Sequence, residues 1–203
     1  MTTLALLLCS LALSAPTPSR ARPRGYTYAT PRMTRQFKGK TVLFVGDSMI
    51  VTGLDIWARN WVEKNGGTYR RHYYSSSTTR SWATTRALEY ALQHYKPHFV
   101  FVVLGSNELY IPNPHLHAGY VRTILKKLGK RPYRWIGPPR WAPDTGIVKI
   151  LASIVPANRF YPFNGRHIGR AKDGKHPSIE GSRTWAHDIF RWYAARLKKE
   201  GQP

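Results

Sequence analysis

The chain has 203 residues, of which 32 are lysine or arginine and only 10 are acidic, so its formal net charge at pH 7 is +22. This length suits one domain with a sizeable core, and the single cysteine, Cys9, excludes an intrachain disulfide. The charge predicts attraction to an anionic polymer or membrane surface, and no specific nucleic acid partner is predicted from it.

Residues 1–36 differ in composition from the rest of the chain. Leu4–Leu13 is an apolar run whose length suits the central region of a signal peptide and is too short to span a bilayer. Residues 16–36 are rich in Pro, Arg, Thr and Ser without hydrophobic periodicity, which predicts a basic, mostly disordered linker. We therefore expect a secreted or cell-envelope protein whose catalytic domain covers residues 37–203.

The domain begins with a short apolar run, Val42–Val45, which predicts a strand buried on both faces, as at the centre of a parallel sheet. Gly46 ends this strand, and Asp47 and Ser48 come just before a helical pattern. A serine on a tight strand-to-helix turn lies where open α/β sheets bind their ligands. Taken alone, however, Asp47 or Ser48 could equally be a helix N-cap.

The remaining elements alternate between helix and strand. Helices are predicted where apolar residues recur at helical spacing and strands where short β-prone runs occur. In chain order, the pattern predicts helix 54–64, strand 68–74, helix 82–92, strand 98–104, helix 116–128, strand 133–136, helix 145–154, strand 159–161 and helix 179–197. This alternation indicates an α/β fold with a parallel sheet and helices on both faces.

Polar segments follow three of the predicted strands, at Ser48, at residues 75–79 and at Asn107. Because right-handed crossovers place the ends of parallel strands at one edge of the sheet, these segments can converge. The edge would then carry a serine hydroxyl, several backbone N–H groups and a side-chain amide.

A serine hydroxyl becomes a good nucleophile when a neighbouring base takes its proton, and that base is usually a histidine oriented by an acid. His176 stands out among the eight histidines because Asp173 precedes it by three residues, a spacing that a tight turn can bridge. Two other acids and two other histidines could take these roles but lack the spacing: Asp144, Asp188, His167 and His187.

Three sequence blocks together resemble the SGNH (GDSL-type) hydrolase family. The blocks are Gly46-Asp47-Ser48, Gly105-Ser106-Asn107-Glu108 and Asp173-Gly174-Lys175-His176-Pro177, and the resemblance extends over roughly residues 40–198. It implies a flavodoxin-like three-layer α/β/α sandwich with about five parallel strands, and no metal or organic cofactor. It also implies particular roles: Ser48 as nucleophile, His176 as general base and acid, Asp173 as orienting carboxylate and Asn107 as oxyanion donor.

The chain departs from the family at one block. The second block normally supplies a glycine whose backbone N–H enters the oxyanion hole, whereas residues 75–79 here read Ser-Ser-Ser-Thr-Thr. A backbone donor does not require glycine if another residue adopts the needed conformation. The Ser48 N–H and the N–H of either Ser76 or Ser77 are therefore the expected backbone donors.

These features predict a serine esterase or acyl hydrolase that cleaves a carboxylic ester through an acyl-enzyme. The substrate would be a small-molecule or carbohydrate ester, such as an O-acetylated sugar, or a lipid ester. One alternative is a polysaccharide O-acetyltransferase with the same triad. A second is a non-catalytic polyanion-binding domain, which the charge and the missing glycine motivate.

Overall fold

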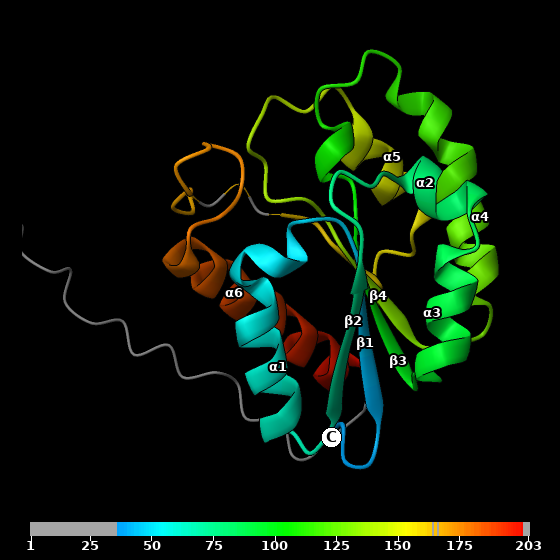
Figure 1. Ribbon diagram of the computed structural model, residues 1–203, viewed down its shortest axis with the longest axis vertical. Coiled ribbons are helices and arrows are strands. Elements are labelled where there is room, and N and C mark those ends of the chain that lie inside the picture. Colours follow the sequence, from blue (N-terminus) through cyan, green and yellow to red (C-terminus); the bar gives the residue numbers. More distant parts are fainter. Residues whose placement is uncertain (1–35, 164, 166, 201–203) are drawn as a thin grey trace, which may run out of the picture.

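The computed structural model describes residues 36–163, 165 and 167–200, and in them a five-stranded parallel sheet lies between two layers of helices (Figure 1). The predicted α/β/α sandwich is thereby confirmed, whereas the apolar leader and nearly all of the basic linker fall outside the described residues. The strands run in the order β2-β1-β3-β4-β5. They are β1 (Thr41–Gly46), β2 (Thr68–Tyr73), β3 (Phe99–Val103), β4 (Tyr133–Ile136) and β5 (Phe160–Tyr161).

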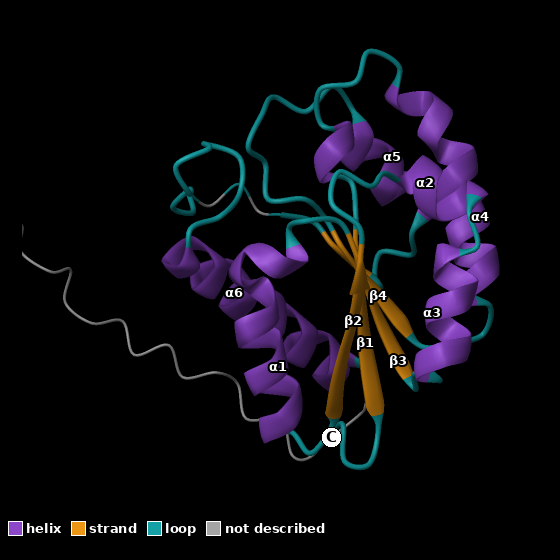
Figure 2. Ribbon diagram, viewed as in Figure 1, coloured by secondary structure: helices purple, strands orange, loops and turns teal. Residues whose placement is uncertain are grey.

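The helices divide between the two faces of the sheet (Figure 2). One face is covered by α1 (Asp55–Lys64) and α6 (Ile179–Lys199). The other is covered by α2 (Thr79–Thr84), α3 (Ala87–Tyr95), α4 (His117–Leu128) and α5 (Ile147–Ile154). Short helical turns complete the fold at η1 (Ile50–Leu54), η2 (Ser106–Glu108) and η3 (Pro114–Leu116).

The central strands are apolar without interruption because each of their faces is buried. Phe44 of β1 and Phe101 of β3 stack at 4.6 Å between ring centroids in the core beneath α1 and α6. Their neighbours in sequence, including Val45 and Val102, pack in the core on the opposite face. Both faces of β1 and β3 are thus fixed by packing. The positions at which the two strands end, and from which the loops with Ser48 and Asn107 start, are therefore fixed as well.

The single helix expected over 82–92 is two helices, α2 and α3. Thr85 leaves the helical region at φ −101° and ψ 170°, and its hydroxyl donates to the Ser81 carbonyl at 2.7 Å. A threonine side chain that bonds to the preceding turn competes with helix continuation. The helix over 82–92 was predicted from the spacing of apolar residues, and this spacing gives no information about the side-chain hydrogen bond of Thr85.

The first turn after β1 is held against the start of α6. Gly53 has a φ of 130°, and a Cβ at this position would lie 2.7 Å from the Ser182 hydroxyl oxygen. That hydroxyl donates to the Thr52 carbonyl at 3.1 Å. Ser178 caps α6 by accepting from the Gly181 N–H at 3.0 Å. The contacts of Ser182 join the first turn of α6 to η1, the helical turn that follows Ser48.

Within the described residues, none of the helices combines the length and the apolar character that a membrane span requires.

Candidate active site

Ser48 lies on the tight turn that follows β1. The turn begins with the Asp47 N–H donating to the Val103 carbonyl at 3.2 Å, which continues the pairing of β1 with β3. It closes when the Ile50 and Val51 N–H groups donate to the carbonyls of Asp47 and Ser48. In the described part of the chain the Ser48 N–H has no hydrogen-bond partner, so this donor is available at the sheet edge.

The loop before α6 presents Asp173 and His176 together. The Ala171 N–H donates to the His176 carbonyl at 2.8 Å, which closes the loop into a tight hairpin. Asp173 Oδ1 accepts from the backbone N–H groups of Lys175 and His176 at 2.9 and 3.0 Å. Arg170 fastens the hairpin by donating to the Lys175 carbonyl at 3.0 Å. The carboxylate and the imidazole are therefore oriented by their own backbone.

A chain of hydrogen bonds joins Ser48, His176 and Asp173. Ser48 Oγ lies 2.8 Å from His176 Nε2, and His176 Nδ1 lies 2.5 Å from Asp173 Oδ2. An ionised carboxylate can only accept, so Nδ1 carries a proton and Nε2 is left to accept the serine proton. The His176 hydrogen bond, followed by those from the Lys175 and His176 backbone, lowers the pKa of Asp173 to about 2. Asp173 is therefore a carboxylate at neutral pH.

Two further loops supply possible donors beside Ser48. Asn107 follows β3, and its Nδ2 donates to the Ser77 carbonyl at 2.8 Å, which leaves one amide hydrogen to spare. The Ser77 N–H donates to the Tyr74 carbonyl at 3.3 Å and is therefore engaged in a turn. Among the described residues the Ser76 N–H has no partner, and Ser76 has a φ of 58°. Of the two serines that the sequence left open, Ser76 has the available N–H.

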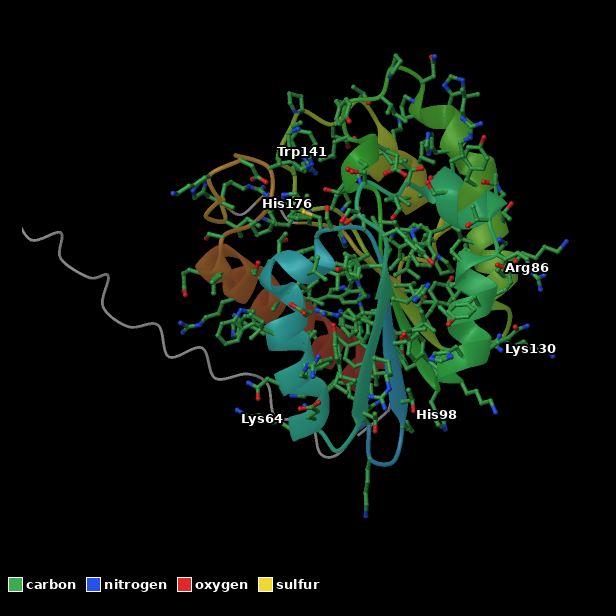
Figure 3. All side chains as sticks on the ribbon, in the orientation of Figure 1. Lys64, Arg86, His98, Lys130, Trp141 and His176 are labelled. Carbon is green, nitrogen blue, oxygen red and sulfur yellow. The ribbon has the colours of Figure 1, made fainter. Side chains whose placement is uncertain are left out.

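Trp141 borders the site between the η2 loop and the His176 loop. Its indole N–H donates to the Ser106 carbonyl at 3.1 Å, and the Lys175 ammonium lies 5.1 Å from the centre of its ring. Figure 3 shows Trp141 and His176 close together beyond the ends of the strands. Tyr110 packs edge-on against Trp141 and is 59% exposed. These aromatic rings therefore lie beside the loop that carries His176.

Asp47, next to Ser48, is fully buried. Its Oδ1 accepts from the Met49 N–H at 2.9 Å, and the Ser106 backbone is close enough to the carboxyl group to lower its pKa as well. Burial raises the pKa of Asp47 to about 8; the Met49 hydrogen bond opposes this rise, and the Glu108 carboxylate adds to it. The folded protein therefore takes up a proton at Asp47 that the unfolded chain releases near pH 4.

This uptake makes the stability of the protein depend on pH. Between about pH 4 and about pH 8 Asp47 is more protonated in the folded state than in the unfolded state, so its contribution to the free energy of unfolding falls as pH rises. Asp47→Asn keeps the oxygen that faces Met49 but does not titrate. We expect the variant to lose less stability than the wild type between about pH 5 and about pH 8 in urea unfolding. Parallel losses in the two proteins would contradict the assignment.

The alternative acids and bases lie in other contacts. Asp144 Oδ1 accepts from the Gly146 N–H at 2.9 Å at the start of α5. His187 and Asp188 face each other on α6 at 3.8 Å. The ring that reaches Ser48 is that of His176. No group of three or more His, Cys, Asp or Glu side chains suited to a metal ion occurs in residues 36–163, 165 and 167–200.

Two residues near the site were not singled out from the sequence. Glu108 and His117 both join a network around Thr79, in which Glu108 has a structural role. The Thr79 N–H donates to Glu108 Oε1 at 2.5 Å, and its hydroxyl lies 2.6 Å from His117 Nδ1. The only sequence signal was the position of Glu108 directly after Asn107.

Comparison with solved structures shows that this α/β sandwich is shared with several esterases and related proteins. TesA matches with a TM-score of 0.64 at 20% identity, over 78% of this chain and 100% of TesA. A catalytic mutant of Axe2, an acetylxylan esterase from Geobacillus stearothermophilus, matches with a TM-score of 0.60 at 13% identity, over 78% and 96% of the two chains. The psychrotrophic esterase EstA from Pseudoalteromonas sp. matches with a TM-score of 0.59 at 16% identity, over 78% and 99%.

The sequence itself matches no protein-family model and no curated protein. At the identities of the structural matches the likeness concerns the fold, which is the one implied by the three sequence blocks.

Proposed function

We propose that this protein is a serine ester hydrolase that works through Ser48, His176 and Asp173. The observation that carries the proposal is the continuous hydrogen-bond chain from Ser48 Oγ through the His176 ring to Asp173. The available N–H groups of Ser48 and Ser76 and the amide of Asn107 lie on the loops around that hydroxyl. Together they provide the parts that acyl transfer requires: a nucleophile, a base and donors for an oxyanion.

The reaction follows from these parts. Ser48 Oγ attacks the ester carbonyl carbon as its proton moves to His176 Nε2, and the carbonyl oxygen becomes an oxyanion facing the donors. The tetrahedral intermediate then breaks its bond to the alcohol oxygen, which takes the proton from His176. Water attacks the acyl-serine while His176 Nε2 takes its proton, and return of that proton to Ser48 releases the carboxylic acid. Asp173 stabilises the imidazolium in both steps.

A cavity beside the Ser76 loop is a candidate site for the part of the ester that lies away from the reacting carbonyl, since Ser48, Asn107 and His176 do not line it. The cavity has a volume of about 540 Å³ and contains no side chain of Leu, Ile, Val, Met or Phe. Its walls combine aromatic rings with hydroxyl groups and one guanidinium, so a sugar ring could stack its flat face on the rings and bond its hydroxyls to the polar groups. The lining residues are Tyr74, Ser75, Ser76, Ser77, Ser81, Trp82, Thr85, Arg86, Ala87 and Tyr90.

The net charge of +22 supports the further proposal that the carrier of the ester is anionic. Such a carrier would be an acidic polysaccharide or an anionic envelope surface, where a secreted protein would meet it. Attraction of this kind weakens with added salt.

An ester panel tests the proposal. The wild-type protein is expected to react with a serine-directed fluorophosphonate and to hydrolyse nitrophenyl acetate and acetylated oligosaccharides faster than long-chain nitrophenyl esters. Product analysis with an unacetylated polysaccharide present separates hydrolysis from acetyl transfer. A protein that binds anionic polymers but neither labels nor hydrolyses any ester would be a non-catalytic binding domain.

Asn107→Ala removes the side-chain donor and is expected to lower kcat by about 100- to 1,000-fold, because loss of one oxyanion donor typically has this effect. The measurement is steady-state hydrolysis of nitrophenyl acetate. Asn113→Ala provides the control, since Asn113 is exposed and makes no side-chain cap in its own loop. Equal turnover by the two variants would exclude Asn107 as a donor.

A further inference from the structure

Ser76 adopts a conformation that usually calls for glycine. Its φ is 58°, in the left-handed region where a side chain is disfavoured. Ser76 is also exposed, so packing of its own side chain does not hold it there. The turn closed by the Ser77 N–H on the Tyr74 carbonyl spans Ser76, and the contacts of the residues after this turn decide whether it stays in place with the Ser76 N–H available.

Two consecutive residues, Asn107 and Glu108, form hydrogen bonds with the loop just after Ser76. Asn107 Nδ2 donates to the Ser77 carbonyl at 2.8 Å, and Glu108 Oε1 accepts from the Thr79 N–H at 2.5 Å. Both contacts come from η2, whose start is tied to the central strand β3. The segment from Ser77 to Thr79 is thus fixed at its two ends to one rigid support.

The Glu108 contact is made in a fully buried place. Glu108 and Thr79 are both 0% exposed. The network continues to His117 of α4, whose Nδ1 lies 2.6 Å from the Thr79 hydroxyl and 3.6 Å from Glu108 Oε1. The second carboxylate oxygen, Oε2, has no partner in the described part of the chain. Burial of a half-satisfied carboxylate costs stability, so a gain in stability alone does not account for it.

We propose that Glu108 is a positioning residue that, together with Asn107, holds Ser76 in its left-handed conformation and so replaces the glycine missing from this loop. The inference rests on the proposed function and deepens it, because it assigns how the Ser76 donor is kept in place. Glu108 itself makes no contact with the reacting atoms. It acts on them through the Thr79 N–H.

The test compares Glu108→Ala with the conservative Glu108→Gln. The alanine variant loses the acceptor for Thr79, and we expect kcat for nitrophenyl acetate to fall about 100-fold with KM changed less than about threefold, as for a displaced catalytic group. Glutamine keeps an acceptor oxygen and should restore kcat to within about tenfold of the wild type. Glu63→Ala, on the exposed surface of α1, is the control and should behave as wild type.

A second substitution separates positioning from a general loss of structure. Ser76→Gly removes the side chain that disfavours the left-handed backbone, so in the Glu108→Ala background it should recover at least about tenfold of the lost kcat. The melting temperature of each variant is measured in parallel. Recovery of turnover without recovery of melting temperature supports the proposal. Failure of Ser76→Gly to restore any turnover in a folded Glu108→Ala protein would overturn it.

These outcomes differ from failure of the proposed function. If the wild type neither labels with fluorophosphonate nor hydrolyses esters, the proposed function is wrong. Amide hydrogen exchange of residues 74–79 then tests whether Glu108 holds this loop in place. Faster exchange there in Glu108→Ala than in Glu63→Ala supports it, and equal exchange contradicts it.

Discussion

Replacing Ser48 with alanine is expected to lower ester hydrolysis by about 10⁴- to 10⁶-fold, the range found when a triad nucleophile is removed. In the proposed mechanism the Ser48 hydroxyl forms the acyl bond, and its partner at 2.8 Å, His176 Nε2, moves the protons. Labelling by a fluorophosphonate should disappear at the same time. Hydrolysis of nitrophenyl acetate by purified protein gives the rate, and mass spectrometry gives the labelled residue.

The fold should survive this substitution. The Ser48 side chain makes one part-buried hydrogen bond, so its loss is expected to change the free energy of unfolding by about 1 kcal/mol. Ser153→Ala is the matched control: this serine is exposed on α5, and its hydroxyl donates to the Ile150 carbonyl within the same helix. Wild-type turnover by a folded Ser48→Ala protein would refute the assignment of the nucleophile.

Gly46→Ala is expected to have the largest effect on stability. Gly46 ends β1, and a Cβ there would lie 1.9 Å from the Val103 carbonyl oxygen and 2.8 Å from the Val103 carbonyl carbon. Both strands are at the centre of the sheet, packed on two faces, so neither backbone can move aside without breaking the pairing of β1 with β3. We expect a loss of about 3 kcal/mol or more, at the upper end of overpacking costs.

Thermal and urea unfolding measure this loss. For a chain of this size it corresponds to a decrease in Tm of about 6 °C or more. Gly119→Ala is the matched control, since a Cβ at Gly119 of α4 would meet no atom within 4 Å. An alanine within a helix stabilises by up to about 1 kcal/mol over glycine. Similar Tm values for the two variants would show that β1 and β3 do not approach as closely as the structure has them.

The sheet could be predicted from the sequence because its strongest signals are local. The uninterrupted apolar runs of β1 and β3 can only be buried on both faces, and alternation with helices then implies parallel strands. The division of one predicted helix into α2 and α3 could not be predicted in this way. It depends on the backbone conformation of Thr85, which the spacing of apolar residues does not report.

Part of the proposed site could likewise be predicted from local sequence spacing, and part could not. Asp173 and His176 are three residues apart, so their contact is a local property of one turn and follows from spacing. The choice between Ser76 and Ser77 stayed open because it depends on which N–H the turn from Tyr74 uses. Buried contacts between distant segments, such as Glu108 with Thr79, leave no pattern in a single sequence.

The order of the site along the chain has a consequence for how it forms during synthesis. Ser48 and His176 are separated by 128 positions, and α6, which follows the histidine, packs against α1 near the start of the domain. A ribosome that has translated β1 to β4 has therefore produced the proposed nucleophile and oxyanion donors but not the proposed base, His176. A nascent or prematurely terminated chain would be inert toward esters, and chemistry would begin only after the last helix has docked.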